Sequence, residues 1–418
     1  MNVRIRTWPW AVLSLTLACA TQQATAPRQS EVPAPASTDT PRPPEFRLGT
    51  EVRPRAYTVE LTVDPEREGF DGVVEVALEL SEPTRQLWLH GNGLTVKEAT
   101  LTAGARTSPA RAVTEGEQFL GFLLEEPVGP GEATLRVVYE GRASAKETTG
   151  LFRQRDGERW YALTQFQPDD ARRAVPCFDE PGFKVPWQLT LRVRPELAAF
   201  ANTPVESEEV GADGLKTVRF RPTPPLPSYL LAFAVGPFET VDAGPAGSKG
   251  APVRIVVPHG RKAEAEWAAH ATPPLVQHLE EYFGLPYPYE KLDVLAIPQP
   301  VLFGAMENPG LITFQMPLLL ARPEQDSLER QRQFTVVQAH ELAHQWFGNL
   351  VTLAWWDDTW LNESFATWLA FKVTDAWQPG WNMDAERVRT RHHALQADRL
   401  TTARSIRQPV KSEGDILT

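Results

Sequence analysis

The chain has 418 residues, of which 53 are acidic and 42 are basic, so its formal net charge at pH 7 is −11. A chain of this length is too long for one ordinary core, and it predicts two large domains. The acidic balance and the lack of a long basic run argue against a nucleic-acid partner, and no partner protein is indicated.

Residues 1–19 have the pattern of an export signal. The start is basic, and the apolar stretch 10–18 is too short to span a bilayer. Cys19 follows Ala18 as at a bacterial lipoprotein cleavage site, whereas Ala18 and Ala20 also fit ordinary signal peptidase. We expect export to the bacterial cell envelope, with a lipid on Cys19 as the only membrane anchor. Ordinary cleavage would leave the protein periplasmic or secreted.

Residues 20–46 are rich in Pro, Ala, Ser and Thr, and we expect a linker because such a segment buries too little apolar surface to fold. If Cys19 belongs to the leader, the other cysteine, Cys177, has no partner for a disulfide. We expect Cys177 to be a small buried residue.

Residues 47–240 predict an all-β domain. Segments in which apolar and polar residues alternate recur between turn signals, and this period matches strands that bury one face. The clearest segments are 56–63, 72–80, 86–90, 133–139 and 188–193. Their spacing is typical of a β sandwich or saddle.

Residues 241–418 predict a second domain that contains both helices and strands. A strand pattern at 253–257 precedes a helical pattern at 264–282, and a further helix is expected over 334–347. Gly348 and Asn349 are expected to end that helix. The predicted fold class is therefore α+β, with the chemistry in the second domain.

The second domain contains the motif His340-Glu341-Leu342-Ala343-His344, and Glu363 follows after eighteen intervening residues. Histidines four apart on a helix share one face, so both imidazoles can reach one metal ion. Glu363 can supply a third ligand and leave a fourth position for water, as in a catalytic zinc site. Glu341 can then act as general base on an activated water. This pattern predicts one Zn²⁺ per chain, although related ions fit the same ligands.

Several collinear stretches resemble the zinc aminopeptidase family of aminopeptidase N and leukotriene hydrolase, the gluzincins. They are residues 53–57, 165–181, 228–236, 304–308 and the zinc motif through residue 364. The resemblance implies an N-terminal β saddle or sandwich followed by a thermolysin-like catalytic domain, which would be incomplete in this chain.

The same resemblance implies a set of substrate-binding residues. Glu307 corresponds to the glutamate that holds the free α-amine of the peptide, Gln167 to a residue that shares this task, and Gln165 to one that lines the first side-chain pocket. The segment whose backbone pairs with the peptide corresponds to Gly304, Ala305 and Met306. The physics agrees, because a buried ammonium needs a carboxylate partner, and one fixed anion places the first peptide bond beside the metal.

The expected function is zinc-dependent hydrolysis of the N-terminal peptide bond in peptides with a free N-terminus. The family also uses a tyrosine downstream of the third ligand to stabilise the oxyanion. All seven tyrosines of this chain precede the motif: Tyr57, Tyr139, Tyr161, Tyr229, Tyr282, Tyr287 and Tyr289. We therefore expect a fragment with impaired activity, and a naturally short protein is the other explanation.

Two other functions share part of this pattern. A zinc endopeptidase would have the same motif but no use for Glu307 and Gln167. An exported lipoprotein that binds zinc and peptide N-termini without efficient catalysis would explain the missing tyrosine, but not the intact Glu341. The exopeptidase interpretation accounts for more of these residues.

The remaining charged and histidine clusters are expected to be structural. The charges of residues 169–173 and 179–180 predict ion pairs or turns, and His392 and His393 lie in a basic stretch that predicts a solvated helix face. Asp357 and Asp358 are candidates for orienting a metal-binding imidazole, and the sequence does not choose between them.

Overall fold

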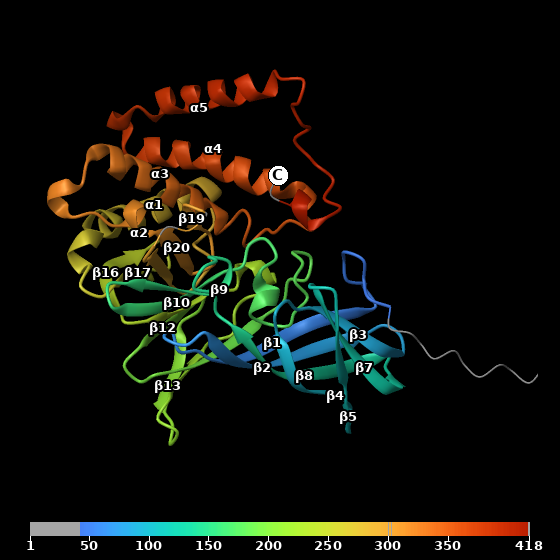
Figure 1. Ribbon diagram of the computed structural model, residues 1–418. Coiled ribbons are helices and arrows are strands. Elements are labelled where there is room, and N and C mark those ends of the chain that lie inside the picture. Colours follow the sequence, from blue (N-terminus) through green and yellow to red (C-terminus); the bar gives the residue numbers. More distant parts are fainter. Residues whose placement is uncertain (1–41, 300, 302, 417–418) are drawn as a thin grey trace, which may run out of the picture. The chain divides into compact units, whose positions relative to one another are not determined.

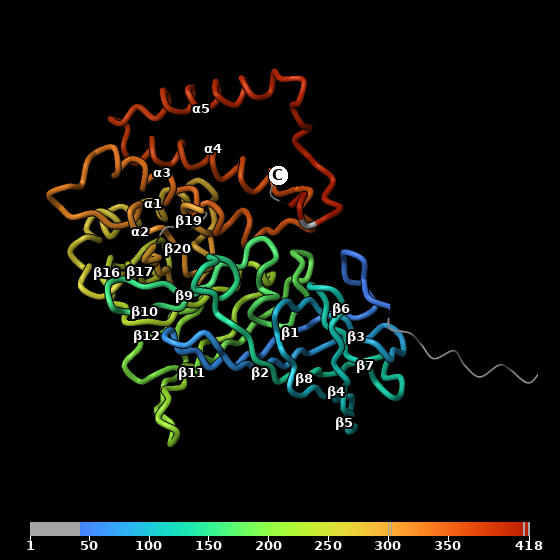
Figure 2. Tube along the Cα trace, viewed as in Figure 1, coloured from blue at the N-terminus to red at the C-terminus, as the bar shows by residue number. Residues whose placement is uncertain are grey.

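The computed structural model describes residues 42–299, 301 and 303–416 (Figure 1; Figure 2). These residues all lie in the unit Pro41–Thr418. The export signal, Cys19 and most of the linker fall outside the described residues, so what we expect of them stays a prediction. Sheets come first along the chain and a region of mixed helices and strands follows, which confirms the α+β fold class.

The largest sheet of the described residues has eight strands in the order β13-β14-β11-β1-β2-β8-β4-β5. The strands are β1 (Val52–Thr62), β2 (Gly69–Leu80), β4 (Thr95–Ala103), β5 (Arg106–Pro109), β8 (Gly131–Arg142), β11 (Trp187–Val193), β13 (Val205–Val210) and β14 (Lys216–Phe220). Neighbouring strands are antiparallel except β1 and β11, which are parallel. In Figure 1, β1, β2 and β8 run side by side through the middle of this sheet.

The alternation of apolar and polar residues in the sequence explains why the central segments form strands with one buried face. Along β2 and β8, buried residues alternate with residues that are exposed or partly exposed. The buried faces, which include Val74 and Val137, belong to one large apolar core. The strands expected at 72–80 and 133–139 are confirmed inside these longer elements. β13 differs because all of its residues are exposed and it forms one edge of the sheet.

Two smaller sheets complete the N-terminal part that the structure describes. One contains β3 (Thr84–His90), β7 (Phe119–Val128) and β6 (Arg111–Glu115) in that order. The other contains β12 (Ala198–Ala201), β15 (Phe233–Gly236), β10 (Arg159–Gln165) and β9 (Gly150–Asp156). Consecutive residues of β9, β10 and β15 are buried, so these strands lack the alternation by which the sequence revealed the others.

A five-stranded sheet follows. Its strands, in spatial order, are β16 (Phe238–Ala246), β17 (Ala251–Pro258), β18 (Leu292–Ile297), β20 (Leu311–Gln315) and β19 (Ala305–Met306). β17, β18 and β20 are parallel, and β16 and β19 pair with their neighbours in the antiparallel sense. The strand expected at 253–257 is confirmed within β17. The change from one sheet to the next falls between Gly236 and Phe238, close to the domain limit expected at residue 240.

The helices of the described residues lie in the second half of the chain, apart from one short 3-10 turn at Ala171–Arg173. The α-helices are α1 (Glu266–Phe283), α2 (Met316–Leu319), α3 (Leu328–His344), α4 (Thr359–Trp377) and α5 (Met383–Asp398). The 3-10 helices are Ala171–Arg173, Ser228–Leu230, Lys262–Ala265, Pro323–Gln325, Trp356–Asp358, Pro379–Trp381 and Glu413–Asp415. The helix expected at 264–282 is confirmed as α1, although it contains Pro273 and Pro274. α1, α3 and α4 share a core with the five-stranded sheet, so the helices that carry the predicted metal ligands rest on a packed layer.

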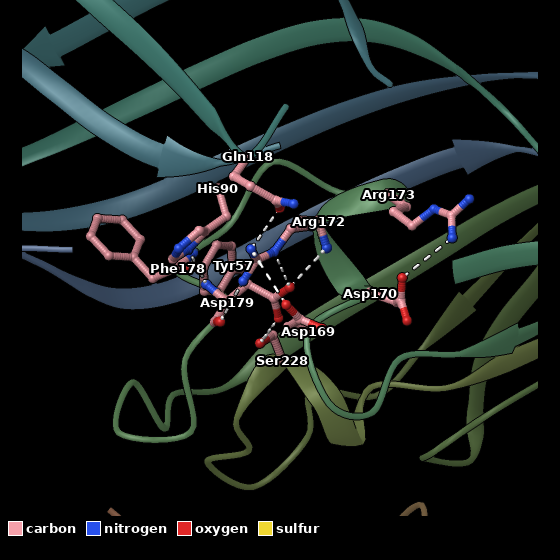
Figure 3. A network of polar contacts seen from close by, with 10 residues as sticks. All are labelled: Tyr57, His90, Gln118, Asp169, Asp170, Arg172, Arg173, Phe178, Asp179 and Ser228. Atoms are coloured by element: carbon pink, nitrogen blue, oxygen red, sulfur yellow. Dashed lines mark hydrogen bonds and ion pairs between the residues drawn. The ribbon is translucent and has the colours of Figure 1, made fainter. Parts of the chain in front are cut away.

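A buried ion pair organises the loop that follows β10 (Figure 3). Arg172 donates to Oδ2 of Asp179 from its backbone amide at 3.1 Å and from Nε at 3.0 Å. Ser228 donates to Oδ1 of the same carboxylate at 2.5 Å. The Arg172 and Asp179 side chains are 7% and 0% exposed. These charges are therefore structural, as the sequence predicts.

α5 has a mostly exposed surface, and His392 and His393 both face solvent, which confirms the predicted solvated face. Within the part of the chain that the structure describes, no helix has both the length and the apolar character that a bilayer span requires.

Candidate metal centre

Both histidines of the motif lie at the end of α3. The hydroxyl of Ser327 caps the start of this helix by accepting a hydrogen bond from the amide of Arg330. His340 and His344 are one turn apart, and their Nε2 atoms are separated by 3.0 Å. The α-helix ends at His344, before the expected end at residue 347, because the next two amides bond to carbonyls three residues back and form a tighter turn.

α4 brings Glu363 to the same point. Oε2 of Glu363 lies 3.2 Å from Nε2 of His340 and 3.8 Å from Nε2 of His344. Tetrahedral ligands about 2.0–2.1 Å from a zinc ion are about 3.3 Å from one another. The three donor atoms have spacings on either side of that value, so His340, His344 and Glu363 fit a single zinc ion.

The second nitrogen of each imidazole has its own partner. Nδ1 of His344 lies 3.1 Å from the carbonyl oxygen of Phe347, to which it donates when Nε2 carries the lone pair. Nδ1 of His340 lies 3.3 Å from the hydroxyl of Thr367. Burial lowers the pKa of both histidines, which favours the neutral form that binds metals.

The expectation that Asp357 or Asp358 orients an imidazole is wrong. Oδ1 of Asp357 accepts a hydrogen bond from the amide of Val410 at 2.8 Å, and both aspartates form ion pairs with Arg407. Their carboxylates therefore tie a later segment of the chain to the start of α4. A carbonyl and a hydroxyl contact the imidazoles in their place.

A cavity of about 440 Å³ contains the candidate ligands. The other predicted site residues that line it are Gln167, Gly304, Ala305, Glu307 and Glu341. Glu341 is only 6% exposed. Burial, and then the negative charges of Glu307 and Glu363, raise the pKa of Glu341 well above its ordinary value. A raised pKa makes the Glu341 carboxylate a stronger proton acceptor than an ordinary glutamate.

Glu307 follows the two-residue strand β19. Its side chain is buried, and none of the described residues donates a hydrogen bond to its Oε1 atom. Burial, and next the charge of Glu363, raise the pKa of Glu307 to about 8. A buried carboxylate oxygen without a hydrogen-bond partner is costly, so a cationic ligand beside it would be stabilising.

Two predicted substrate residues do not line this cavity. Gln165 ends β10 and is buried, with no partner for its Nε2 among the described residues. Met306 packs with Tyr229 and Trp356 in a separate apolar cluster. The roles that the resemblance implies for Gln165 and Met306 stay predictions.

The apolar and hydroxyl groups that complete the cavity were not predicted from the sequence. They are Phe303, Val336, Val337, Thr359, Thr367, Ala370 and Phe371. Some of these residues could have been identified by their helical spacing from the metal ligands. Val336 precedes His340 by four residues, and Thr367 and Phe371 follow Glu363 by four and eight, so they extend the faces that bear the ligands.

Two protein-family models match the chain. The model described as the Peptidase M1 N-terminal domain matches residues 53–230. The model described as the Peptidase family M1 domain matches residues 267–418. The first match covers most of the β-rich part, and the second includes all three candidate metal ligands.

Known proteins from plants and animals are similar over most of this chain. Aminopeptidase M1-D of Oryza sativa subsp. japonica is 35% identical over 378 residues, which cover 89% of this chain and 42% of the relative. Aminopeptidase M1-A of the same organism is 38% identical over 350 residues, which cover 81% and 39%. Glutamyl aminopeptidase of Mus musculus is 32% identical over 402 residues, which cover 89% and 42%. The chain spans about two fifths of the length of these relatives.

Proposed function

Because this chain belongs to the peptidase M1 family, we propose that it binds one zinc ion and hydrolyses the N-terminal peptide bond of peptides with a free amine. The observation that carries the proposal is the buried carboxylate of Glu307. It lacks a partner for one oxygen among the described residues and lines the same cavity as His340, His344 and Glu363. A peptide ammonium is the cation that this carboxylate would hold, whereas an endopeptidase has no need for such an anion.

His340, His344 and Glu363 would hold the metal. A zinc ion bound there supplies a Lewis acid that polarises the scissile carbonyl and lowers the pKa of water. The carbonyl of Phe347 and the hydroxyl of Thr367 would keep the two imidazoles turned toward it.

Glu341 would be the general base. It lines the cavity and lies on the same helix as both histidines. Its raised pKa lets the carboxylate take a proton from the attacking water and hold it until the leaving amine accepts it. A glutamine at this position keeps the shape but removes the proton acceptor.

Glu307 would bind the substrate ammonium. Pairing with a positive charge stabilises the ionised carboxylate in its buried setting, and it fixes the amino end of the peptide. The side-chain oxygens of Glu307 and Glu341 lie within 4.8 Å of each other, so an ammonium held by Glu307 would place the first peptide bond beside Glu341.

The first experiment compares a tripeptide that has a free N-terminus with its N-acetylated form, using the zinc-loaded chain. We expect cleavage of the free-amine peptide only, because acetylation removes the charge that Glu307 binds. Equal cleavage of both peptides would contradict the exopeptidase assignment and would indicate an endopeptidase.

The second experiment replaces the base. Glu341→Gln should lower turnover by about 10²-fold or more while the chain keeps its zinc. Glu329→Gln is the matched control, because Glu329 is an exposed glutamate in the first turn of the same helix. Turnover that survives Glu341→Gln unchanged would rule out the assigned base.

A second candidate function is the binding of peptide N-termini without efficient hydrolysis. It would use the same cavity and the same Glu307 carboxylate as the proposed enzyme. A binding protein would show no turnover, and its affinity for a free-amine peptide would be unchanged by Glu341→Gln.

We also propose that the protein is exported and lipidated on Cys19. The basic start, the apolar stretch 10–18 and the Ala18–Cys19 junction support this proposal. Labelled palmitate supplied to a bacterial host should appear on the chain, and Cys19→Ala should abolish the label. A labelled Cys19→Ala chain would contradict it.

A further inference from the structure

The backbone carbonyl of Glu307 accepts two side-chain hydrogen bonds. Nε2 of Gln345 donates to it at 2.8 Å, and Nδ2 of Asn349 donates to it at 2.7 Å. Gln345 and Asn349 are 0% and 1% exposed, so water does not compete for these bonds. The position of this carbonyl is therefore set by two buried amides that the reaction itself does not use.

Both amides are joined closely to the helix that carries the metal ligands. Gln345 directly follows His344, and its Nε2 also lies 3.2 Å from the carbonyl oxygen of Glu341. The backbone N–H of Asn349 donates to the backbone carbonyl of His344 at 3.0 Å. Lys184 holds the other side of this turn by donating to the carbonyl of Asn349 at 2.8 Å. The two amide groups are therefore positioned by the same backbone that positions the histidines.

The strand before Glu307 offers much less support. β19 consists of two residues, Ala305 and Met306, and it pairs with β20 at the edge of the sheet. The carboxylate of Glu307 has one oxygen without a donor among the described residues, so the side chain does little to hold itself in place. The two bonds to the carbonyl therefore add to the short strand pairing in fixing where the carboxylate lies in the cavity.

We propose that Gln345 and Asn349 are positioning residues that fix the distance between the amine-binding carboxylate of Glu307 and the metal ligands. This inference rests on the proposed aminopeptidase function and adds two residues to it. If the two amides are removed, the Glu307 carboxylate is held less firmly. The affinity for a ligand's α-amine should then fall, while the affinity of the zinc site for a metal-binding group should not. A purely structural role would weaken both kinds of recognition together.

The test uses the zinc-loaded full chain and two probes, leucine hydroxamate and its deaminated analogue 4-methylpentanohydroxamate. Both present a hydroxamate to zinc, and only the first has an α-amine. The ratio of their dissociation constants, measured by calorimetry, reports the amine contact alone. In the unmodified chain we expect leucine hydroxamate to bind roughly thirtyfold more tightly or better, the scale of a buried charge pair.

The double variant Gln345→Met, Asn349→Ala should reduce this ratio by about tenfold, while the affinity for the deaminated probe changes less than about threefold. Gln338→Leu is the matched control, because Gln338 is a fully buried amide on α3 whose polar atoms have no partner among the described residues. It should leave the ratio unchanged. An unchanged ratio in a double variant that still binds zinc would overturn the proposal.

The single variants decide the outcome if the double variant fails to fold or loses zinc. Each keeps one of the two bonds, so each should lower the ratio severalfold, and an unchanged ratio in both would contradict the inference. The variant Glu307→Gln distinguishes a failure of the positioning role from a failure of the proposed aminopeptidase function. If Glu307→Gln leaves the ratio intact, the amine-binding role and the proposed function fail. If it lowers the ratio but the amide variants do not, only the positioning role fails.

Discussion

Nε2 of His340 and Nε2 of His344 lie 3.0 Å apart, close to the spacing of two ligands on one zinc ion. Because both residues sit one turn apart on a helix with a packed core beneath it, this pair does not need the metal in order to come together. The ion would bind to a site that the fold has already formed, and its binding energy would add to the stability of that fold.

Removal of zinc should lower the thermal stability. With free zinc at 100 times its dissociation constant, binding adds about 2.7 kcal/mol to the free energy of unfolding. Calorimetry with and without a chelator should therefore show a melting temperature that falls by a few degrees in chelator. His344→Ala should abolish this shift, whereas the exposed control His392→Ala should keep it. A zinc-dependent shift in His344→Ala would contradict the ligand assignment.

Thr367→Val should weaken zinc binding without removing a ligand. Its hydroxyl is the partner of Nδ1 in His340, and loss of such a partner typically costs about 10–100-fold in metal affinity. Competition with a fluorescent zinc chelator measures the change. Thr374→Val is the control, because Thr374 is a buried threonine of α4 whose hydroxyl has no partner among the described residues. Equal affinities in the two variants would show that Thr367 does not orient the imidazole.

Arg172→Met should destabilise the N-terminal part strongly. It leaves the buried carboxylate of Asp179 without its charge partner, which costs about 3–5 kcal/mol in the free energy of unfolding. Arg142→Met is the control, since Arg142 pairs with Glu68 while 79% of its own side chain is exposed. That surface pair should contribute less than about 1 kcal/mol. Urea denaturation measures the free energy of unfolding of both variants. Similar losses would show that burial does not make the Arg172–Asp179 pair more important than the exposed pair.

Gly310→Ala should be more damaging than Gly260→Ala, although both glycines have a positive φ. A Cβ at Gly310, where φ is 68°, would lie 2.3 Å from the carbonyl oxygen of Asn202. A Cβ at Gly260, where φ is 82°, would meet no described atom within 4 Å. Both substitutions carry the cost of the left-handed conformation, about 1 kcal/mol, and only the first adds a steric clash. Urea denaturation should show at least about 1 kcal/mol more loss at Gly310, and equal losses would mean that the backbone shifts to relieve the contact.

Features that depend on local spacing could be predicted from the sequence. The four-residue spacing of His340 and His344 defines one helix face wherever the helix lies, and alternation identified β2 and β8 because each buries one face. β9 and β10 were not found, since most of their residues are buried on both faces and show no alternation.

Features that depend on distant partners could not be predicted. The carbonyl that Gln345 and Asn349 bind lies about forty residues earlier in the chain, and nothing near those amides identifies it. Asp357 was misread for the same reason. An acidic residue near a third ligand pairs with whichever group the fold brings close, and here that group includes Arg407, fifty residues further on.

β13 forms one edge of the eight-stranded sheet, and all of its side chains are exposed. Edge strands present unpaired amides and carbonyls that can recruit a strand from another molecule and begin aggregation. Here that edge carries Glu208 and Glu209. Two copies that met along it would bring their carboxylates together, so the negative charge of this strand opposes self-association of the sheet.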